Sequence, residues 1–203
     1  MTTRRNAFTL IELLVVVAVI AILAAIAVPN FLEAQVRSKV SRVHADLRTL
    51  ATAIESYSVD AGRPPFDGLQ GFAHRGWATS LGRMTTPVAY ITSVPGDIFQ
   101  DQNVPDTMVP GESHFIDTPG GTHSYDYSTA EWEGVPTDTA AADLWNRNFR
   151  GSAWKLTSAG PDLAFQNDGS FYGFAEIYDP TNGSTSLGDI VRTQGGARGG
   201  GVR

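Results

Sequence analysis

Residues 8–28 read FTLIELLVVVAVIAILAAIAV, and this stretch decides the fold of the N-terminal part of the 203-residue chain. Glu12 is the one ionisable side chain in the run. As a helix, the run is about 30 Å long at about 1.5 Å per residue, which matches the hydrocarbon core of a bilayer. A helix that is apolar on every face has no side suited to water. The stretch therefore predicts a membrane-spanning segment.

Three interpretations of this segment compete, and they differ in where the chain is cut. A secretory signal would use Arg4 and Arg5 as its basic region, with cleavage at the small-x-small sequence Ala25-Ile26-Ala27. A plain membrane anchor would keep the whole segment and place its basic flank inside. In the third interpretation, the cut falls before the apolar run, between Ala7 and Phe8.

Glu12 favours the third interpretation. A carboxylate at the centre of a membrane helix costs about 2.5–3.5 kcal/mol on insertion scales, and less toward the interface, so its presence predicts a function and a partner. Cleavage between Ala7 and Phe8 would create a positive α-amino group on Phe8. The same amine of a neighbouring subunit would pair with Glu12 and offset the cost of burying both charges.

Residues 4–12, RRNAFTLIE, resemble the prepilin cleavage and methylation motif of type IV pilins and type II secretion pseudopilins. In that family a membrane-embedded aspartyl peptidase cuts before the Phe and methylates its amine. The resemblance implies cleavage between Ala7 and Phe8, N-methylation of Phe8, and assembly roles for Glu12 and Pro29. Ala7 stands where the family usually has Gly, and its small side chain is compatible with cleavage.

An amphipathic pattern follows the apolar run. Apolar residues recur at alternating intervals of four and three, which places them on one helix face. They are Val36, Val40, Val43, Leu47, Leu50, Ile54, Tyr57 and Ala61. Gly62 and the prolines at 64–65 then stop the helix. We expect one helix of about 80 Å from Phe8 to Ala61, kinked or locally melted at Pro29. The stripe is either the spine of a C-terminal domain, which we favour, or a coiled-coil seam.

Short apolar segments separated by turn residues follow Pro65 and indicate an antiparallel sheet. We expect strands at 124–128, 153–157, 171–178 and 189–193, with a hairpin turn at 167–169. The sheet would cover the apolar stripe of the helix. The predicted fold class is α+β and pilin-like: a long N-terminal helix on a small antiparallel β-sheet head.

The expected organisation has five parts. They are a cytoplasmic leader (1–7), a transmembrane and assembly helix (8–28), its amphipathic continuation (29–61), a globular α+β head (62–193) and a flexible Gly-rich tail (194–203).

Parts of the head resemble the major pseudopilin of type II secretion, namely residues 86–99, 154–162 and 188–190. Residues 100–150 are not covered, and we take them as a candidate enlarged variable loop of unassigned role. The resemblance implies a calcium site. Its candidate ligands are chiefly Asp162 and Asp189, with Asp179 and Asn182 nearby. Calcium prefers such oxygen ligands, yet Asp and Asn are also good turn formers, so a purely structural role is the alternative.

Composition and motifs argue against several other functions. A net charge of −6 argues against general nucleic-acid binding, and the chain has no Cys for a disulfide. No nucleophile elbow, H-E-x-x-H, P-loop or dinucleotide fingerprint occurs, so we predict that the chain is not an enzyme. Two His-x-x-Asp pairs, at 114–117 and 123–126, lack a metal-binding spacing and are expected in surface loops.

The alternative function comes from another class. The apolar segment would be a plain anchor or a signal peptide, and the head an exported or membrane-anchored ligand-binding module or hydrolase. Trp132, Trp145 and Trp154 would line its ligand groove, although core packing is the commoner fate of such residues.

The family resemblance also implies a location and partners. The chain would be a single-pass protein of the bacterial inner membrane with its head outside the cytoplasm, and then part of a homo-oligomeric filament. The implied partners are prepilin peptidase, the inner-membrane assembly platform with its ATPase, and minor pseudopilins. The basic residues after the membrane segment, Arg37, Lys39, Arg42 and Arg48, form either a solvated face or a contact with acidic surfaces of adjacent subunits. The motif does not distinguish a secretion pseudopilin from a pilus subunit.

Overall fold

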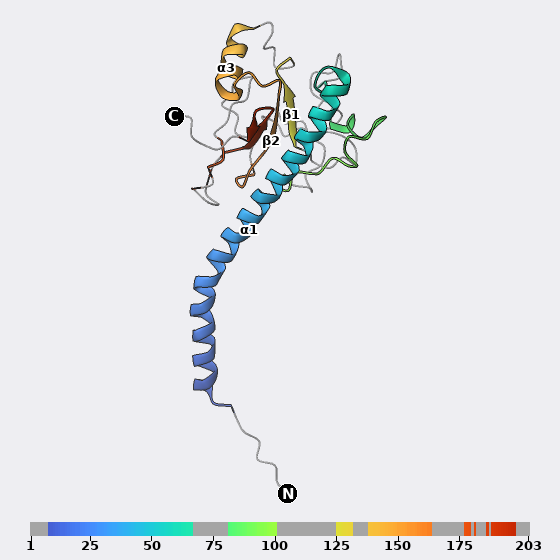
Figure 1. The fold of residues 1–203 in the computed structure, drawn as a ribbon. Coiled ribbons are helices and arrows are strands. Elements are labelled where there is room, and N and C mark those ends of the chain that lie inside the picture. The colour runs from blue at the N-terminus through green and yellow to red at the C-terminus, as the bar shows by residue number, and fades with distance from the viewer. Residues whose placement is uncertain are drawn as a thin grey trace, which may run out of the picture.

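A long helix projects from a small α+β head in the computed structural model of the chain (Figure 1). The structure describes residues 8–66, 81–100, 125–131, 138–163, 177–179, 181, 186 and 188–197. Its elements are α1 (Leu10–Ala61), β1 (Asp126–Thr129), α3 (Thr139–Phe149), β2 (Trp154–Ser158), β3 (Ile190–Thr193) and β4 (Gly196–Ala197). The predicted fold class, a long N-terminal helix on a small antiparallel sheet, is confirmed.

Local sequence signals set both ends of α1. Thr9 is the N-cap, and Gly62 ends the helix with a left-handed φ of 72°, a conformation that glycine adopts without strain. The helix is continuous through Pro29, so the local melting expected there is absent. Figure 1 shows that the axis bends between the apolar part and the part on the head. Proline removes a backbone donor and its ring clashes with the preceding turn, which accounts for a bend in this region.

The four strands form one antiparallel sheet in the order β1-β2-β3-β4. Tyr127 lies opposite Leu156, and Leu156 lies opposite Arg192. Strands β1, β2 and β3 fall at or within two residues of their predicted positions. Of the predicted strand 171–178, only Ile177 and Tyr178 lie within the described residues, and Ile177 forms an isolated parallel bridge with Asp189. The predicted turn at 167–169 lies outside them.

The main core lies between α1 and the sheet. Most of the predicted stripe of α1 is buried there, together with side chains from the facing surface of the sheet. The fully buried side chains there include Val43, Leu47, Leu50, Ile54, Tyr125, Tyr127, Trp154 and Leu156. The stripe is therefore the spine of the head, as we favoured over a coiled-coil seam.

Hydrogen bonds fix the angle and register of α1 on the sheet. The Tyr125 hydroxyl donates to Asp46 at 2.9 Å, and Trp154 Nε1 donates to Glu55 Oε1 at 2.9 Å. These bonds join β2 and the residue just before β1 to two different turns of the helix. They satisfy polar groups that would otherwise be costly at the edge of the core.

Helix α3 covers the opposite face of the sheet and was not predicted. Trp145 and Phe149, one turn apart, pack on Val191 with their ring centroids 4.7 Å apart. Trp145 Nε1 donates to the backbone carbonyl of Ser152, and Asp138 caps the helix through the backbone N–H of Ala140. The interpretation of 100–150 as a variable loop is thus wrong for residues 139–149. Trp145 and Trp154 are core residues, and Trp132 lies outside the described part.

A buried ion pair lies under α3. Lys155 Nζ is 3.7 Å from Asp126 Oδ2 and 5.6 Å from the ring centroid of Phe149. Both charged side chains are nearly inaccessible to solvent. The prediction of a surface-loop position is therefore wrong for Asp126, which is a buried strand residue. His114, Asp117 and His123 lie outside the described residues.

A second buried carboxylate, that of Asp97, connects residues 97–99 to the end of β2. Asp97 accepts the backbone N–H of Phe99 at 3.0 Å and that of Ala159 at 3.2 Å. Burial raises the pKa of Asp97, and these two hydrogen bonds act in the opposite direction because they favour the ionised form. Asp97 thereby ties residues 97–99 to the end of β2.

The ordered part of the head continues past Thr193. Strand β4 pairs with β3, with Thr193 opposite Gly196. The sheet therefore extends into the range predicted as a flexible tail, 194–203. Residues 198–203 lie outside the described part.

Candidate assembly and processing site

The first turn of α1 holds Glu12 beside the N-terminus that cleavage after Ala7 would create. Thr9 and Glu12 form a reciprocal capping box. Glu12 Oε2 accepts from the backbone N–H of Thr9 at 2.8 Å and from the Thr9 hydroxyl, while the Glu12 N–H donates to Thr9 Oγ1 at 3.4 Å. Phe8 precedes the cap and is exposed. Ala7 lies outside the described residues.

This geometry gives Glu12 a role inside its own chain that the sequence analysis missed. The capping box satisfies two backbone donors that would otherwise be free at the start of a helix. It also fixes the carboxylate next to the N-terminal backbone instead of letting it point along the apolar surface. The signal was present in the sequence, because Thr9-x-x-Glu12 has the spacing of a capping box.

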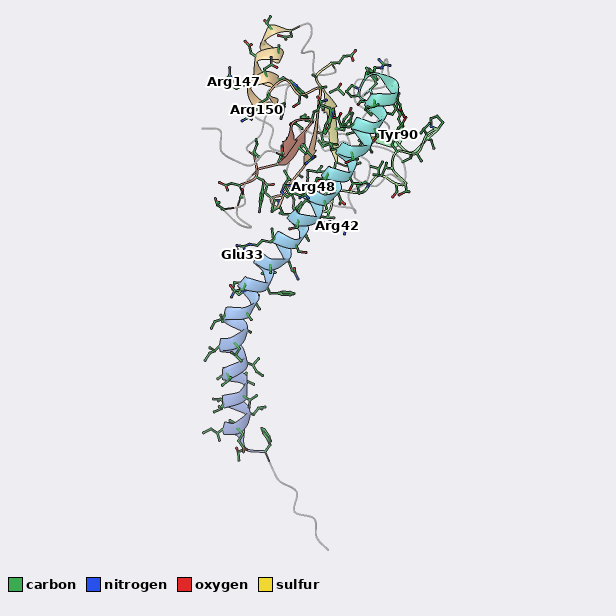
Figure 2. All side chains as sticks on the ribbon, in the orientation of Figure 1. Glu33, Arg42, Arg48, Tyr90, Arg147 and Arg150 are labelled. Carbon is green, nitrogen blue, oxygen red and sulfur yellow. The ribbon has the colours of Figure 1, made fainter. Side chains whose placement is uncertain are left out.

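The apolar part of α1 is exposed along its whole length. Every large apolar side chain from Phe8 to Leu32 is at least 50% exposed. Figure 2 shows these side chains projecting from all sides of the helix below Glu33. The helix is long and apolar enough to cross a membrane. A continuous apolar surface of this size marks contact with lipid or with other chains. Pro29 lies within this exposed part, below the turns that pack on the head.

The three described calcium candidates lie on neighbouring loops and already have bonds within the chain. Asp162 Oδ2 accepts the N–H of Gly188 at 3.2 Å. Asp179 accepts both donors of Thr181, which lowers the pKa of Asp179. The buried Asp189 accepts the N–H of Tyr178 at its carbonyl. Asn182 lies outside the described residues.

These contacts are of the kind that Asp makes as a turn former. Among the residues that the structure describes, no group of three or more His, Cys, Asp or Glu side chains is arranged to hold a metal ion. The bond from Gly188 holds Asp162 close to the residue that precedes Asp189 in the chain.

The fold and the N-terminal site together define a class: a pilin-like protein with a capped, apolar N-terminal helix. Comparison with known proteins agrees with this assignment. The family described as "Prokaryotic N-terminal methylation motif" matches residues 2–28. The chain is thus similar to the proteins of this family in its N-terminal segment.

Three relatives illustrate the similarity. The type IV major pilin protein PilA of Myxococcus xanthus is 52% identical over 60 residues, which are 30% of this chain and 27% of PilA. The type IV major fimbrial protein FimA of Dichelobacter nodosus is 44% identical over 80 residues, 39% of this chain and 47% of FimA. The type II secretion system core protein G of Klebsiella pneumoniae is 26% identical over 144 residues, 70% of this chain and 95% of that protein.

The matches cover different shares of the three relatives. The chain spans between a quarter and a half of the length of the two pilins, while it spans nearly all of core protein G. No solved structure matches the chain significantly. The pilin and pseudopilin homologues are structural proteins, so the prediction that this chain is not an enzyme is confirmed by them.

Proposed function

We propose that this chain is a structural subunit of a pilus-like filament, cut between Ala7 and Phe8 and assembled through α1. One observation carries the proposal: a carboxylate is held at the start of a helix whose apolar surface is exposed on all sides. In the membrane, lipid covers that surface. In the filament, the helices of neighbouring subunits cover it.

The Phe8 amine of a neighbouring subunit supplies the missing cation. Thr9 donates both of its hydrogen bonds to Glu12 Oε2, so Oε1 remains for a partner from another chain. In an apolar surrounding, two unpaired charges are costly and a hydrogen-bonded pair is tolerated. The pair therefore sets the register between neighbouring helices. Pro29 supports the same packing, because the bend in α1 separates the filament core from the head.

Within this class we favour a type II secretion pseudopilus over a type IV pilus. The similarity to core protein G extends over 144 residues and so includes the head, whereas the PilA and FimA matches cover 60 and 80 residues. The chain would begin as a single-pass inner-membrane protein with its head outside the cytoplasm. Prepilin peptidase, an assembly platform with its ATPase, and minor pseudopilins would be its partners.

Processing can be tested at the proposed cleavage site. Ala7→Glu should block cleavage, because a charged side chain replaces the small residue that precedes the cut. Mass spectrometry of the chain purified from membranes should then show an intact leader, whereas the wild-type chain should begin at N-methylated Phe8. Ala7→Gly, which restores the usual family residue, is the matched control. Wild-type protein that starts at Met1 or Val28 would contradict the proposed function.

Calcium binding remains a separate proposal from the family resemblance. If Asp162 and Asp189 contribute to a site, millimolar CaCl₂ should raise the thermal midpoint of the detergent-solubilised chain, because a ligand that binds only the folded state stabilises it. Asp162→Asn should remove the calcium-dependent rise, while equimolar MgCl₂ should not reproduce it in the wild type. Equal midpoints with calcium and with a chelator would rule the site out.

A further inference from the structure

Two arginines that are far apart in the chain come together where α1 packs against β3. Arg48 lies on α1, on the part that runs along the head (Figure 2), and Arg192 lies on β3. Arg192 is on the face of the sheet that packs on α1, because Leu156, directly opposite it on β2, is in that core, as is Ile190 two residues earlier. Burial lowers the pKa of Arg192, and the charge of Arg48 lowers it further. The two positive charges are therefore neighbours.

A histidine borders both arginines. His44 lies one turn before Arg48 on the same side of α1 and is half-buried. Burial lowers the pKa of His44, and the charges of Arg48 and Arg192 lower it further. The imidazole is therefore neutral at pH 7, and a neutral imidazole still carries one N–H donor. We call Arg48, Arg192 and His44 the arginine site: two cations beside one neutral donor.

The described part of the chain supplies no anion to the arginine site. The ion pairs there are Arg37–Glu33, Arg42–Asp46 and Lys155–Asp126. Glu55, two turns after Arg48 on α1, accepts instead from Trp154 Nε1. Arg192 Nε is buried and makes no hydrogen bond. A buried donor without a partner is costly, and two like charges close together add to that cost. An anion between the two arginines would remove both costs.

We propose that Arg48 and Arg192 bind a phosphate-type oxyanion from solution between α1 and β3, with His44 as a further donor. A guanidinium group presents a planar fork of N–H donors that matches two oxygens of a phosphate, and such charge-assisted bonds are about twice as strong as those between neutral groups. Arg192 supplies a donor that is closed to bulk water, while the exposed Arg48 leaves the site open for entry. This site is additional to the proposed filament function and does not depend on it.

The number and charge of the donors favour a phosphate over a halide or a single carboxylate. Two guanidinium forks and one imidazole N–H need more acceptor sites than the two oxygens of a carboxylate provide, and a halide has no oxygen pair to match a fork. A phosphate monoester carries a charge of about −1.5 to −2 at pH 7, which nearly balances the two arginines. The ligand class is therefore inorganic phosphate or a small phosphate monoester.

A lipid headgroup carries the same phosphate chemistry but lies too far away. Arg48 follows the predicted end of the membrane segment, Val28, by a helical distance of about 30 Å at about 1.5 Å per residue. The headgroup layer adds only about 5–8 Å on each side of the hydrocarbon core. Arg48 is therefore well beyond the headgroups of a bilayer spanned by residues 8–28.

Histidine-selective NMR of the full-length chain in a neutral detergent, titrated with inorganic phosphate, tests the site. A bound anion should raise the pKa of His44, because its effect is opposite in sign to that of the two arginines. The response should saturate as phosphate fills the site. Sodium chloride at equal ionic strength is the control for screening and should give a smaller response that does not saturate. His44→Gln identifies the His44 signal.

Variants of the two arginines show whether they hold the anion. Arg48→Gln and Arg192→Gln should each weaken phosphate binding by about tenfold or more, because each removes one guanidinium fork. Lys39→Gln is the matched control: it removes the same charge from an exposed residue on the opposite side of α1 and should bind phosphate like the wild type. Trypsin resistance of the head in each variant checks that it remains folded.

Several results would overturn the arginine site. A His44 signal that responds to phosphate no more than to chloride would do so, as would unchanged phosphate binding in either folded arginine variant. A raised pKa of His44 in phosphatidylglycerol nanodiscs relative to phosphatidylcholine nanodiscs, without added phosphate, would assign the arginines to lipid headgroups instead of an anion from solution. None of these results bears on filament assembly, which the cleavage-site and Glu12 variants test separately.

Discussion

Glu12→Ala should remove nearly all of the chain from filaments while leaving it folded and inserted in the membrane. The substitution deletes one member of the proposed pair and leaves the Phe8 amine of a neighbouring subunit unpaired among apolar helices. Removing one partner of a buried ion pair costs about 3–5 kcal/mol, and a filament repeats that cost at every subunit contact. Immunoblots of sheared filaments and of membranes should show the chain in the membrane fraction only.

Two control variants separate the charge of Glu12 from its role as a helix cap. Glu12→Gln keeps the side chain that a capping box requires but removes the charge, so it should fail to assemble in the same way as Glu12→Ala. Glu33→Ala removes another carboxylate from α1, one that pairs only with the exposed Arg37, and should assemble normally. Normal filaments from Glu12→Gln would show that the cap is what matters and would contradict the intersubunit pair.

Trp154→Ala should lower the free energy of unfolding of the head by about 3–5 kcal/mol. Trp154 is almost fully buried between β2 and α1, and its Nε1 donates to Glu55. Removing the indole leaves a cavity at the contact that joins the sheet to the helix. Urea unfolding of the detergent-solubilised chain, followed by circular dichroism, should measure the loss as a lower midpoint at an unchanged slope.

Two control variants separate the contribution of Trp154 packing to stability from that of its hydrogen bond. Trp154→Phe keeps an aromatic ring and removes only part of the volume together with the donor to Glu55, so we expect a smaller loss, about 1–3 kcal/mol. Val59→Ala alters an α1 side chain that is 83% exposed and should change stability by no more than about 0.5 kcal/mol. A Trp154→Ala variant with wild-type stability would show that this contact does not stabilise the head.

The sequence predicted the long helix α1 well because its signals are local. The apolar run, the 4-3 spacing of the stripe and the Gly62 stop each act within a few turns of one helix. Glu12 is a candidate assembly residue for a similar reason, since a single carboxylate in an apolar segment is costly wherever the rest of the chain lies. Its bond to Thr9 was equally local and was overlooked.

The head was predicted less completely because its structure depends on contacts between distant segments. Helix α3 is short, and its apolar residues Trp145 and Phe149 acquire a partner only when β3 brings Val191 beneath them. The sheet also buries Asp126 next to Lys155, although the sequence placed Asp126 both in a predicted strand and in a His-x-x-Asp pair expected in a surface loop. No local pattern carries this information, since propensity and periodicity are overridden by tertiary packing.

The amino-acid sequence by itself determined a long helix with an apolar, Glu-bearing start and a buried stripe, because helical period and hydrophobicity act between near neighbours. Only the tertiary structure decided which side chains meet across the head. It brought Arg192 of β3 toward Arg48 of α1, two cations that are far apart in the chain. Charge repulsion depends on distance in space, and that distance is set only when the sheet packs on the helix.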